Sequence, residues 1–269
     1  MNGVIFYEGP SRIDGSPIVG IATFRATNEK TGHLISTWII RSDMHPQDAI
    51  NSGADSAVCG NCPLRGVIRP KSEQTKPTAK FGGETVNKGR SCYVTVAQAP
   101  AAVYKAYKAG HYPKLTKEHR RKFIGRGLRF GSYGDPVAIP LQEWKLLESL
   151  CTGKAAPGYT HQWRNTRFKA WAKKLMASTH TETENEAARA MGWRTFRTII
   201  DMADKTKAEI VCPASKEAGY KATCETCGAC NGRHSESDKR ASVVILAHGG
   251  DGKLQLVEKV VNRIALTVL

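Results

Sequence analysis

The chain has 269 residues, with 40 Lys and Arg against 24 Asp and Glu, which gives a net charge of +16. This length fits one large domain or two small ones. The positive surplus favours nucleic acid as the macromolecular partner, although solvated helix faces give the same composition. No apolar run is long enough to cross a membrane. Residues 1–10 lack the basic start of a secretory signal and carry an acid and a proline, so we expect a cytoplasmic protein.

The first part of the chain predicts β-structure, then a long loop, then a helix. Turn formers between short apolar runs in residues 1–33 predict a β-hairpin, and residues 34–40 predict a strand. Residues 69–90 are rich in Lys, Thr, Gly and Pro and predict a long exposed loop. Residues 92–96 fit either a strand or a helix start, and residues 99–109 predict a helix.

From Gly127 onward, predicted strands and helices alternate. The strands lie at residues 128–133, 159–163, 175–178, 194–199, 208–211 and 242–247, and the helices lie at 141–150, 165–172 and 184–191. Thr183 and Glu186 have the spacing of a capping box for the last helix. Such alternation predicts an α/β fold with a mostly parallel sheet, as a full or an incomplete barrel. The expected parts are an N-terminal β extension at 1–33, a barrel-like core at 34–207, and a cysteine-rich element with the final strands at 208–269.

Polar side chains follow several predicted strands at the point where each strand ends. Asp135, His161 and His180 follow three of them, and Cys212 and His248 follow two later ones. The parallel strands of a barrel end on one face, which carries the active site in such folds. We therefore predict Asp135, His161 and His180 as catalytic residues. Any strand that leaves a core also needs polar residues, and that alternative covers each position taken alone.

Four of the eight cysteines form a group with the spacing of metal ligands. Cys224, Cys227 and Cys230 form a Cys-x-x-Cys-x-x-Cys run, and Cys212 precedes them. Four thiolates this close in sequence can surround one ion, which predicts zinc or an iron–sulfur cluster. Disulfides are the alternative, but a chain of this length builds its own core without them. Cys151 lies in an apolar stretch and is predicted to be a small buried hydrophobe.

A second group has three cysteines, Cys59, Cys62 and Cys92. Three soft ligands suit zinc or an iron–sulfur cluster, and sequence spacing does not separate the two. A four-iron cluster held by three cysteines leaves one iron open to a cofactor or substrate. With zinc, His45 or His111 would supply the fourth ligand, and the site would be structural.

Several segments resemble a group of uncharacterised, largely phage-encoded proteins related to radical S-adenosylmethionine barrels. The matching segments are residues 58–63, 91–93, 129–136, 158–163 and 212–230. The resemblance implies a partial βα barrel with an iron–sulfur site at its mouth and a C-terminal cysteine-rich metal-binding element. Cys59, Cys62, Cys92 and the adjacent Tyr93 would form the cofactor site, with S-adenosylmethionine as a candidate cofactor. A phage-encoded protein would work in the host cytoplasm.

Two functions follow from these observations. The first is a radical-SAM-like iron–sulfur enzyme that acts on nucleic acid or a nucleotide-derived substrate. The alternative is a non-enzymatic phage protein with two structural zinc sites that binds nucleic acid or inhibits a host factor. In both cases Lys and Arg contact phosphates without reading sequence. We predict Arg120, Arg121 and Lys122 as nucleic-acid contacts because they lie in a concentrated basic run.

Overall fold

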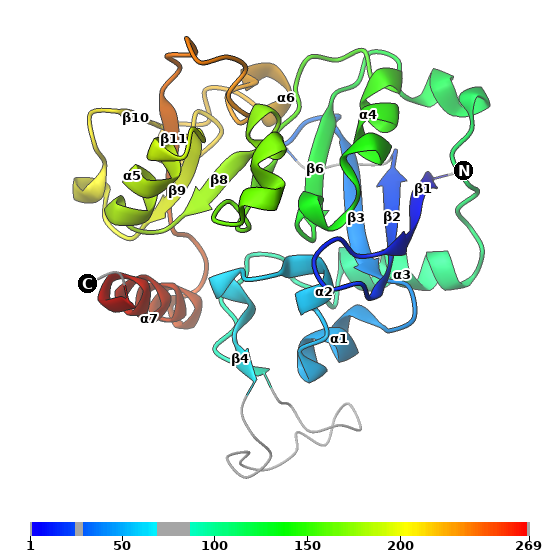
Figure 1. The fold of residues 1–269 in the computed structure, drawn as a ribbon, viewed down its shortest axis with the longest axis horizontal. Coiled ribbons are helices and arrows are strands. Elements are labelled where there is room, and N and C mark those ends of the chain that lie inside the picture. The colour runs from blue at the N-terminus through cyan, green and yellow to red at the C-terminus, as the bar shows by residue number, and fades with distance from the viewer. Residues whose placement is uncertain (1, 25–28, 69–86, 268–269) are drawn as a thin grey trace.

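The computed structural model describes residues 2–24, 29–68 and 87–267, and it has an α/β fold with two main sheets (Figure 1). The first sheet is mixed. In it, β1 (Gly3–Pro10), β2 (Pro17–Thr23) and β3 (Ile35–Arg41) are antiparallel neighbours, and β6 (Leu128–Tyr133) pairs in parallel with β3. The predicted N-terminal hairpin is confirmed, and β2 joins it to the rest of this sheet.

The second sheet is parallel throughout, with strand order β10-β11-β9-β8-β7. Its strands are β7 (Tyr159–Thr160), β8 (Met176–Thr179), β9 (Thr195–Ile199), β10 (Glu209–Val211) and β11 (Ser242–Leu246). Backbone bonds of 2.9 Å from Leu128 N to Ala155 O and from Phe130 N to Pro157 O connect β6 to the segment before β7. The two sheets are thus linked at this edge, and within the described residues they do not close into a barrel.

A short antiparallel pair flanks the segment predicted to be a long loop. β4 (Val67–Ile68) pairs with β5 (Asn87–Lys88). Residues 69–86 of that predicted loop lie outside the described residues.

Helices connect the strands and pack against them. The α-helices are α1 (Pro46–Ser52), α2 (Ser56–Cys59), α3 (Ala99–Lys108), α4 (Leu141–Leu150), α5 (Glu182–Ala190), α6 (Cys224–Cys227) and α7 (Asp251–Thr267). The 3-10 helices are η1 (Pro63–Arg65), η3 (Lys117–Lys122), η4 (Pro136–Ala138), η5 (Thr166–Lys173) and η6 (Met202–Asp204).

The packing of α4 follows directly from its sequence. Trp144 and Leu147 are three residues apart, so both lie on one side of the helix, and both are fully buried. The Trp144 ring lies 4.9 Å from the Phe6 ring and 4.8 Å from the Phe130 ring, measured between centroids. These contacts fix α4 against the mixed sheet.

Alternate residues of the parallel sheet contribute to two separate cores. In β8, Ala177 belongs to the large core shared with the helices, whereas Met176 belongs to a smaller core with Val243. Cys212 and Cys230 are buried in that smaller core. The C-terminal cysteines therefore lie on the face of the sheet away from the main helical core.

Three local predictions need correction. Residues 92–96 form bends and turns, neither strand nor helix. The predicted basic helix at 165–172 is the 3-10 helix η5. The cap of α5 is Thr181, whose side chain accepts from Glu184 N at 3.2 Å, so the helix begins before the predicted Thr183.

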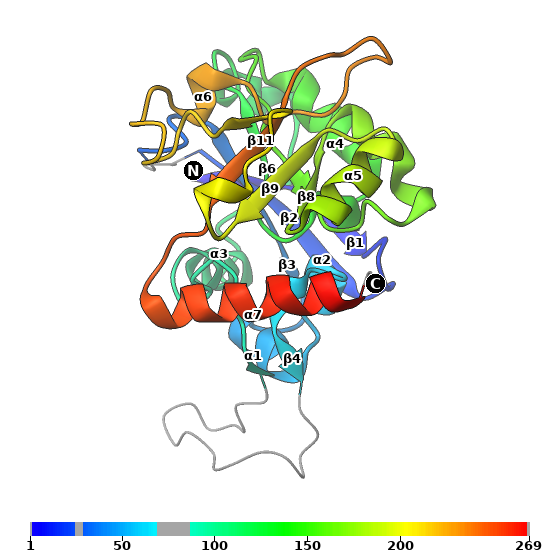
Figure 2. The same ribbon diagram turned by 90° about the vertical axis from the view of Figure 1, so that its left-hand side faces the viewer.

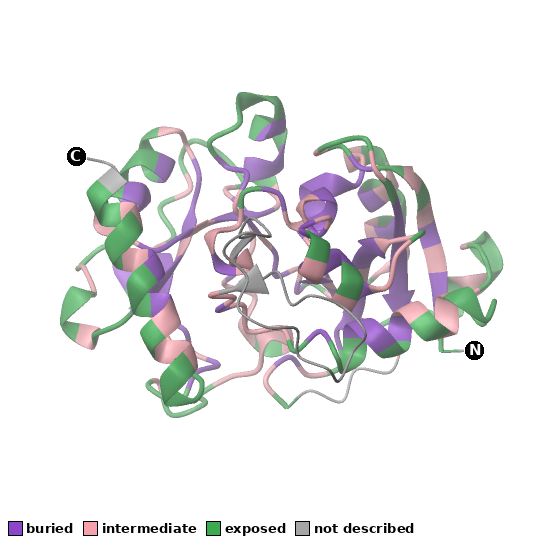
Figure 3. Ribbon diagram, turned by 90° about the horizontal axis from the view of Figure 1, so that it is seen from below, coloured by how far each residue is buried: buried purple, intermediate pink, exposed green. Residues whose placement is uncertain are grey.

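The helix α7 was not predicted from the sequence. It buries Val257 and Val260 and exposes its other sides, as Figure 3 shows from below. In Figure 2 it runs across the lower part of the molecule, above α1 and β4, and it packs against η1. Its Ile264 lines a cavity of about 330 Å³ together with His161 and Trp163. The C-terminal helix thus covers one side of the strand ends described next.

Candidate metal centre

The carboxyl ends of β6, β7 and β8 bring three predicted site residues together. Asp135 Oδ2 accepts hydrogen bonds from Thr160 Oγ1 at 2.9 Å and from the backbone N–H of His161 at 3.0 Å. The Nε2 atoms of His161 and His180 lie 3.3 Å apart, and the two rings are stacked. Asp135, His161 and His180 therefore share one edge, as expected for strands whose ends point the same way.

A loop from the first half of the chain lies against this edge. The helix α2 ends at Cys59, and Gly60 then adopts φ 55° and ψ −132°, a conformation that residues with a Cβ rarely adopt. Cys62 Sγ lies 3.8 Å from His161 Nε2, and Gln162 Nε2 donates to the Cys59 carbonyl at 3.4 Å. The Cys59 to Cys62 loop is thus held beside the histidine pair.

Cys92 lies beside the same Cys59 to Cys62 loop. The backbone N–H groups of Ser91 and Cys92 both donate to the Leu64 carbonyl at 3.1 Å. Because Leu64 lies two residues past Cys62, these bonds place Cys92 beside the Cys59 to Cys62 loop. The structure therefore brings the three predicted ligands of the first group together.

A buried carboxylate joins the two halves of this group. The Asp55 side chain is fully buried, and its oxygens lie 2.6 Å from Arg65 Nη2 and 3.4 Å from Arg90 Nη1. Arg65 also donates to the carbonyls of Gly60 at 3.0 Å and Gly53 at 2.8 Å. Arg65 follows the Cys59 to Cys62 loop, and Arg90 precedes Cys92. Asp55 therefore fixes the positions of these two chain segments relative to each other.

Burial controls the charge of the thiols. It raises the pKa of Cys59 well above its usual value, and the nearby Asp55, Cys62 and Cys92 raise it further, whereas Arg90 lowers it. Burial also raises the pKa of Cys62, with Cys92 as the next cause. Three thiolates at this edge would therefore need a cation among them, and metal binding releases the thiol protons.

Burial also sets the charge of the neighbouring groups. It lowers the pKa of His161 to about 3, helped by His180 and Arg164, and it lowers the pKa of His180. Burial raises the pKa of Asp135 to about 6, against the hydrogen bonds from Thr160 and His161. Both imidazoles are thus neutral at pH 7 and can each present a ring nitrogen as an acceptor or a ligand.

Several polar atoms at this edge are buried without a hydrogen-bond partner among the described residues. They are Ser91 Oγ, Ser132 Oγ, Tyr133 OH, Thr179 Oγ1 and His180 Nδ1. Buried polar atoms are nearly always paired in folded proteins, so a concentration of such atoms indicates a place where a polar ligand or ordered water binds. Ser91 and Thr179 directly precede Cys92 and His180, and Ser132 and Tyr133 lie three and two residues before Asp135.

Two cysteines of the second group, Cys224 and Cys230, lie at the other end of the strands. Cys224 N donates to Lys30 O at 2.9 Å, and Cys230 O accepts from Gly158 N at 3.0 Å. Lys30 precedes β3 and Gly158 precedes β7, so these contacts are at the amino ends of the strands. Figure 1 accordingly shows α6 and α2 at opposite ends of the molecule. Cys212 directly follows β10, but it lies in the smaller core and lines one cavity with the other three cysteines, which corrects the prediction that it opens onto the same site as Asp135.

The four cysteines of the second group line one small cavity. Its volume is about 10 Å³, and its other lining residues in the described part of the chain are Pro and Ala. Burial raises the pKa of Cys230 to about 12, and Cys212, Cys224 and Cys227 raise it as well. Such a space is on the order of one water molecule, which suits a single ion.

Neither cysteine group is arranged as a complete ligand shell. In residues 2–24, 29–68 and 87–267, no three His, Cys, Asp or Glu side chains are positioned to hold a metal ion as they stand. The sulfurs would therefore have to turn toward a common point when an ion binds.

The other predicted site residues have different surroundings. His45 Nδ1 accepts from Gln47 N at 3.2 Å and caps α1, and His111 is exposed, so neither is placed as a ligand to the first group. Cys151 is half-buried at the end of α4, not fully buried, and its thiol donates to Leu147 O at 3.6 Å. Tyr93 stacks on His248, with ring centroids 5.1 Å apart.

The predicted nucleic-acid contacts lie away from the metal centre. Arg120, Arg121 and Lys122 are exposed on η3, and none makes an ion pair with a described residue. Because η3 precedes β6, it lies toward the amino ends of the strands, whereas Asp135 follows β6.

Sequence reasoning missed the residues that position the site. These are Asp55, Arg65, Arg90, Thr160 and Gln162. Thr160 and Gln162 flank a predicted histidine, and that proximity was a usable signal. Nothing in the local sequence marked Asp55.

Comparisons with known proteins identify no family for this chain. No family model, no curated protein and no solved structure matches the chain. In the described part of the chain, no helix has the length and apolar character needed to cross a membrane.

Proposed function

We propose that this chain is a metalloprotein with an iron–sulfur cluster held by Cys59, Cys62 and Cys92. The observation that carries the proposal is the pair of bonds to Leu64 O that sets Cys92 beside the Cys59 to Cys62 loop. Three thiols and two neutral imidazoles form a soft donor set, which suits iron–sulfur clusters and zinc over magnesium or calcium. The unpaired polar atoms around them, counted among the described residues, support a bound group at this edge.

The site's own residues have separate roles in this proposal. A cluster held by three thiolates supplies electron-transfer chemistry and leaves one iron for an external ligand, for which S-adenosylmethionine is a candidate. Asp135 accepts a hydrogen bond from the backbone N–H of His161 and so orients the chain at that residue. His161 and His180 face the thiols and would position a substrate. The substrate class that the basic charge favours is nucleic acid or a nucleotide derivative.

In the same proposal, the second group is a structural zinc site. Cys212, Cys224, Cys227 and Cys230 supply the four thiolates of a closed tetrahedral site. Their cavity has no other ionisable side chain among the described lining residues, so it offers no group for proton transfer.

The test is the absorption spectrum of protein purified without oxygen. Wild-type protein should be brown and lose its colour in air, and Cys62→Ala should be colourless. Cys151→Ala is the matched control, because Cys151 is a half-buried thiol outside both groups, and it should keep the colour. A colourless wild-type protein that carries two zinc ions would contradict the iron–sulfur proposal.

That outcome would support the second candidate, a nucleic-acid-binding protein with two structural zinc sites. The observation in its favour is the exposed basic turn at Arg120, Arg121 and Lys122, which makes no ion pair within the described part of the chain. Its binding would depend steeply on salt, since each phosphate contact releases counterions.

A further inference from the structure

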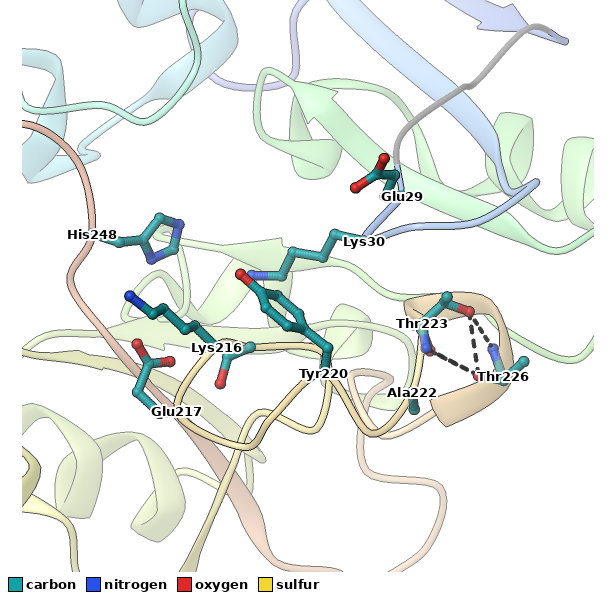
Figure 4. Close-up of a pocket in the computed structure, with 10 residues that line it drawn as sticks. Glu29, Lys30, Lys216, Glu217, Tyr220, Ala222, Thr223, Thr226 and His248 are labelled. Carbon is teal, nitrogen blue, oxygen red and sulfur yellow. Dashed lines mark hydrogen bonds between the residues drawn. The ribbon is translucent and has the colours of Figure 1, made fainter.

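A large cavity is lined by residues that belong to neither cysteine group. Its volume is about 1150 Å³, and it is open to solvent. One wall is the loop from Ser215 to Thr226, and the opposite wall comes from Glu29 and Lys30 before β3 (Figure 4). His248, which follows β11, forms a third side.

The lining has three kinds of polar or aromatic group. Lys30, Lys216 and His248 can contact an anion, and Glu29 and Glu217 can accept hydrogen bonds. Burial raises the pKa of Glu217, but its own backbone N–H, Ser215, His248 and Lys30 lower it overall, so its carboxylate is charged. The cavity is therefore polar and of mixed charge.

Tyr220 is the aromatic group of this cavity. Tyr220 is 65% exposed, whereas a tyrosine ring usually packs against neighbouring side chains. Among the described residues it is the one non-glycine with positive φ, at 50°. Its backbone N–H donates to Ser215 O at 2.9 Å, which holds the loop in this conformation. The loop thus fixes an aromatic ring on the cavity wall, as Figure 4 shows.

We propose that this cavity binds a ribonucleoside phosphate unit. A planar base has an exposed ring in Tyr220 to stack on, and such stacking tolerates any base. Lys216 and His248 match the phosphate, and a carboxylate of Glu29 or Glu217 matches the ribose hydroxyls, as acidic residues do in dinucleotide sites. The volume exceeds that of a typical small-molecule pocket of roughly 300–1,000 Å³, so it has room for a nucleotide that is part of a strand.

The cavity also has a structural connection to the metal centre. The His248 ring that lines it stacks on Tyr93 at 5.1 Å, and Tyr93 directly follows Cys92. Lys253 Nζ lies 6.0 Å from the centre of the Tyr93 ring. The inference rests on the proposed function only in naming its substrate class, since no cysteine is among the described residues that line the cavity.

The test measures nucleotide affinity by titration calorimetry on the full chain purified without oxygen. The probes are AMP, CMP, GMP and UMP, their deoxy counterparts, and a short single-stranded RNA. Ribonucleotides should bind more tightly than deoxynucleotides. Lys216→Ala should weaken binding about tenfold through a lost charged contact to phosphate. Lys145→Ala, which removes an exposed lysine on α4, should leave the affinity unchanged.

Tyr220 allows a matched pair of variants. Tyr220→Asn keeps a residue that tolerates positive φ but removes the ring, and it should also weaken binding about tenfold. Tyr220→Phe keeps the ring and should bind as wild type. If RNA binds and mononucleotides do not, the unit is recognised within a strand, and the same variants must then weaken RNA binding.

Two results would overturn the inference. One is that neither mononucleotides nor RNA bind; the other is that binding is the same in Lys216→Ala, Tyr220→Asn and wild type. Cys62→Ala should still bind nucleotides. A colourless wild-type protein that binds nucleotides through Tyr220 would therefore overturn the iron–sulfur proposal alone, and a brown protein that binds none would overturn only this inference.

Discussion

The two cysteine groups differ in their surroundings more than in their sequence spacing. The group at Cys212 to Cys230 lines a cavity of about 10 Å³ whose other described lining residues are Pro and Ala. The group at Cys59, Cys62 and Cys92 lies at the carboxyl ends of the strands, beside two neutral histidines and several polar atoms without a partner among the described residues. A closed apolar cavity suits a metal that holds the chain together, whereas a polar strand edge suits one that meets a ligand.

The two groups are also held in place differently. Backbone bonds from Cys212 N to Val244 O, from Cys224 N to Lys30 O and from Gly158 N to Cys230 O anchor the C-terminal cysteines. Among the described residues, no ion pair joins the segments that carry these four thiols. The first group is fixed independently of any metal by Asp55, which pairs with Arg65 and Arg90. Loss of the metal should therefore reduce stability most at the C-terminal group.

The largest expected effect is that of Cys227→Ala. Structural zinc contributes on the order of 10 kcal/mol in isolated zinc fingers. At roughly 2–4 °C per kcal/mol for a protein near this size, even a third of that lowers Tm by about 10 °C. Differential scanning calorimetry should show this fall, with Cys151→Ala as the control. A Tm equal to that of Cys151→Ala would show that the C-terminal group does not support folding.

Asp55→Asn should have the next largest effect. It leaves Arg65 and Arg90 without their buried counter-charge, which costs about 3 kcal/mol when a buried pair is broken. The matched control is Asp43→Asn, because Asp43 pairs with Arg41 at 2.7 Å but is half-exposed, and this change should cost less than about 1 kcal/mol. Denaturant unfolding measures both. Equal effects would mean that Asp55 does not hold the first group together.

Gly60→Ala tests the loop between Cys59 and Cys62. Positive φ costs a residue with a Cβ about 1–3 kcal/mol, and a Cβ here would also overlap Gln162. Gly15→Ala is the control, since Gly15 has φ 81° and a Cβ added there would meet no atom within 4 Å. We expect Gly60→Ala to be the less stable of the two and to lose metal from the first group alone. If both variants keep their metals, the loop geometry is unimportant for binding.

The smallest effect on the fold should come from neutralising the basic turn on η3. Replacement of Arg120, Arg121 and Lys122 by Gln should leave Tm nearly unchanged, because all three are exposed. If these residues contact phosphates, each charge removed should make the slope of log affinity against log salt concentration less negative by about 0.7–0.9. Filter binding at several salt concentrations measures this slope. An unchanged slope would leave these charges without a role in binding.

Local patterns predicted much of this fold. Strand and helix spacing placed β3, β6, α4, β8, β9, β10 and β11 within one or two residues, because these elements bury one face with a regular period. The strand predicted at 159–163 is shorter, since β7 ends at Thr160. The same reasoning placed Asp135, His161 and His180 on one edge, since parallel strands end together.

Long-range contacts were beyond that reasoning. The position of Cys92 depends on its bond to Leu64 O, and the position of Cys212 depends on which face of the parallel sheet its loop covers. The role of Asp55 depends on two arginines from different segments. None of these has a periodic signal. The helix α7 did have one, because Val257 and Val260 are three residues apart on one side.

The most direct test of the difference between the two groups is a metal analysis of protein purified without oxygen. Iron, sulfide and zinc would be measured per chain in wild type, Cys62→Ala and Cys227→Ala. We predict that Cys62→Ala loses iron and sulfide but keeps zinc, and that any folded Cys227→Ala loses zinc but keeps iron. Zinc in both groups of the wild type, or loss of the same metal in both variants, would contradict the account.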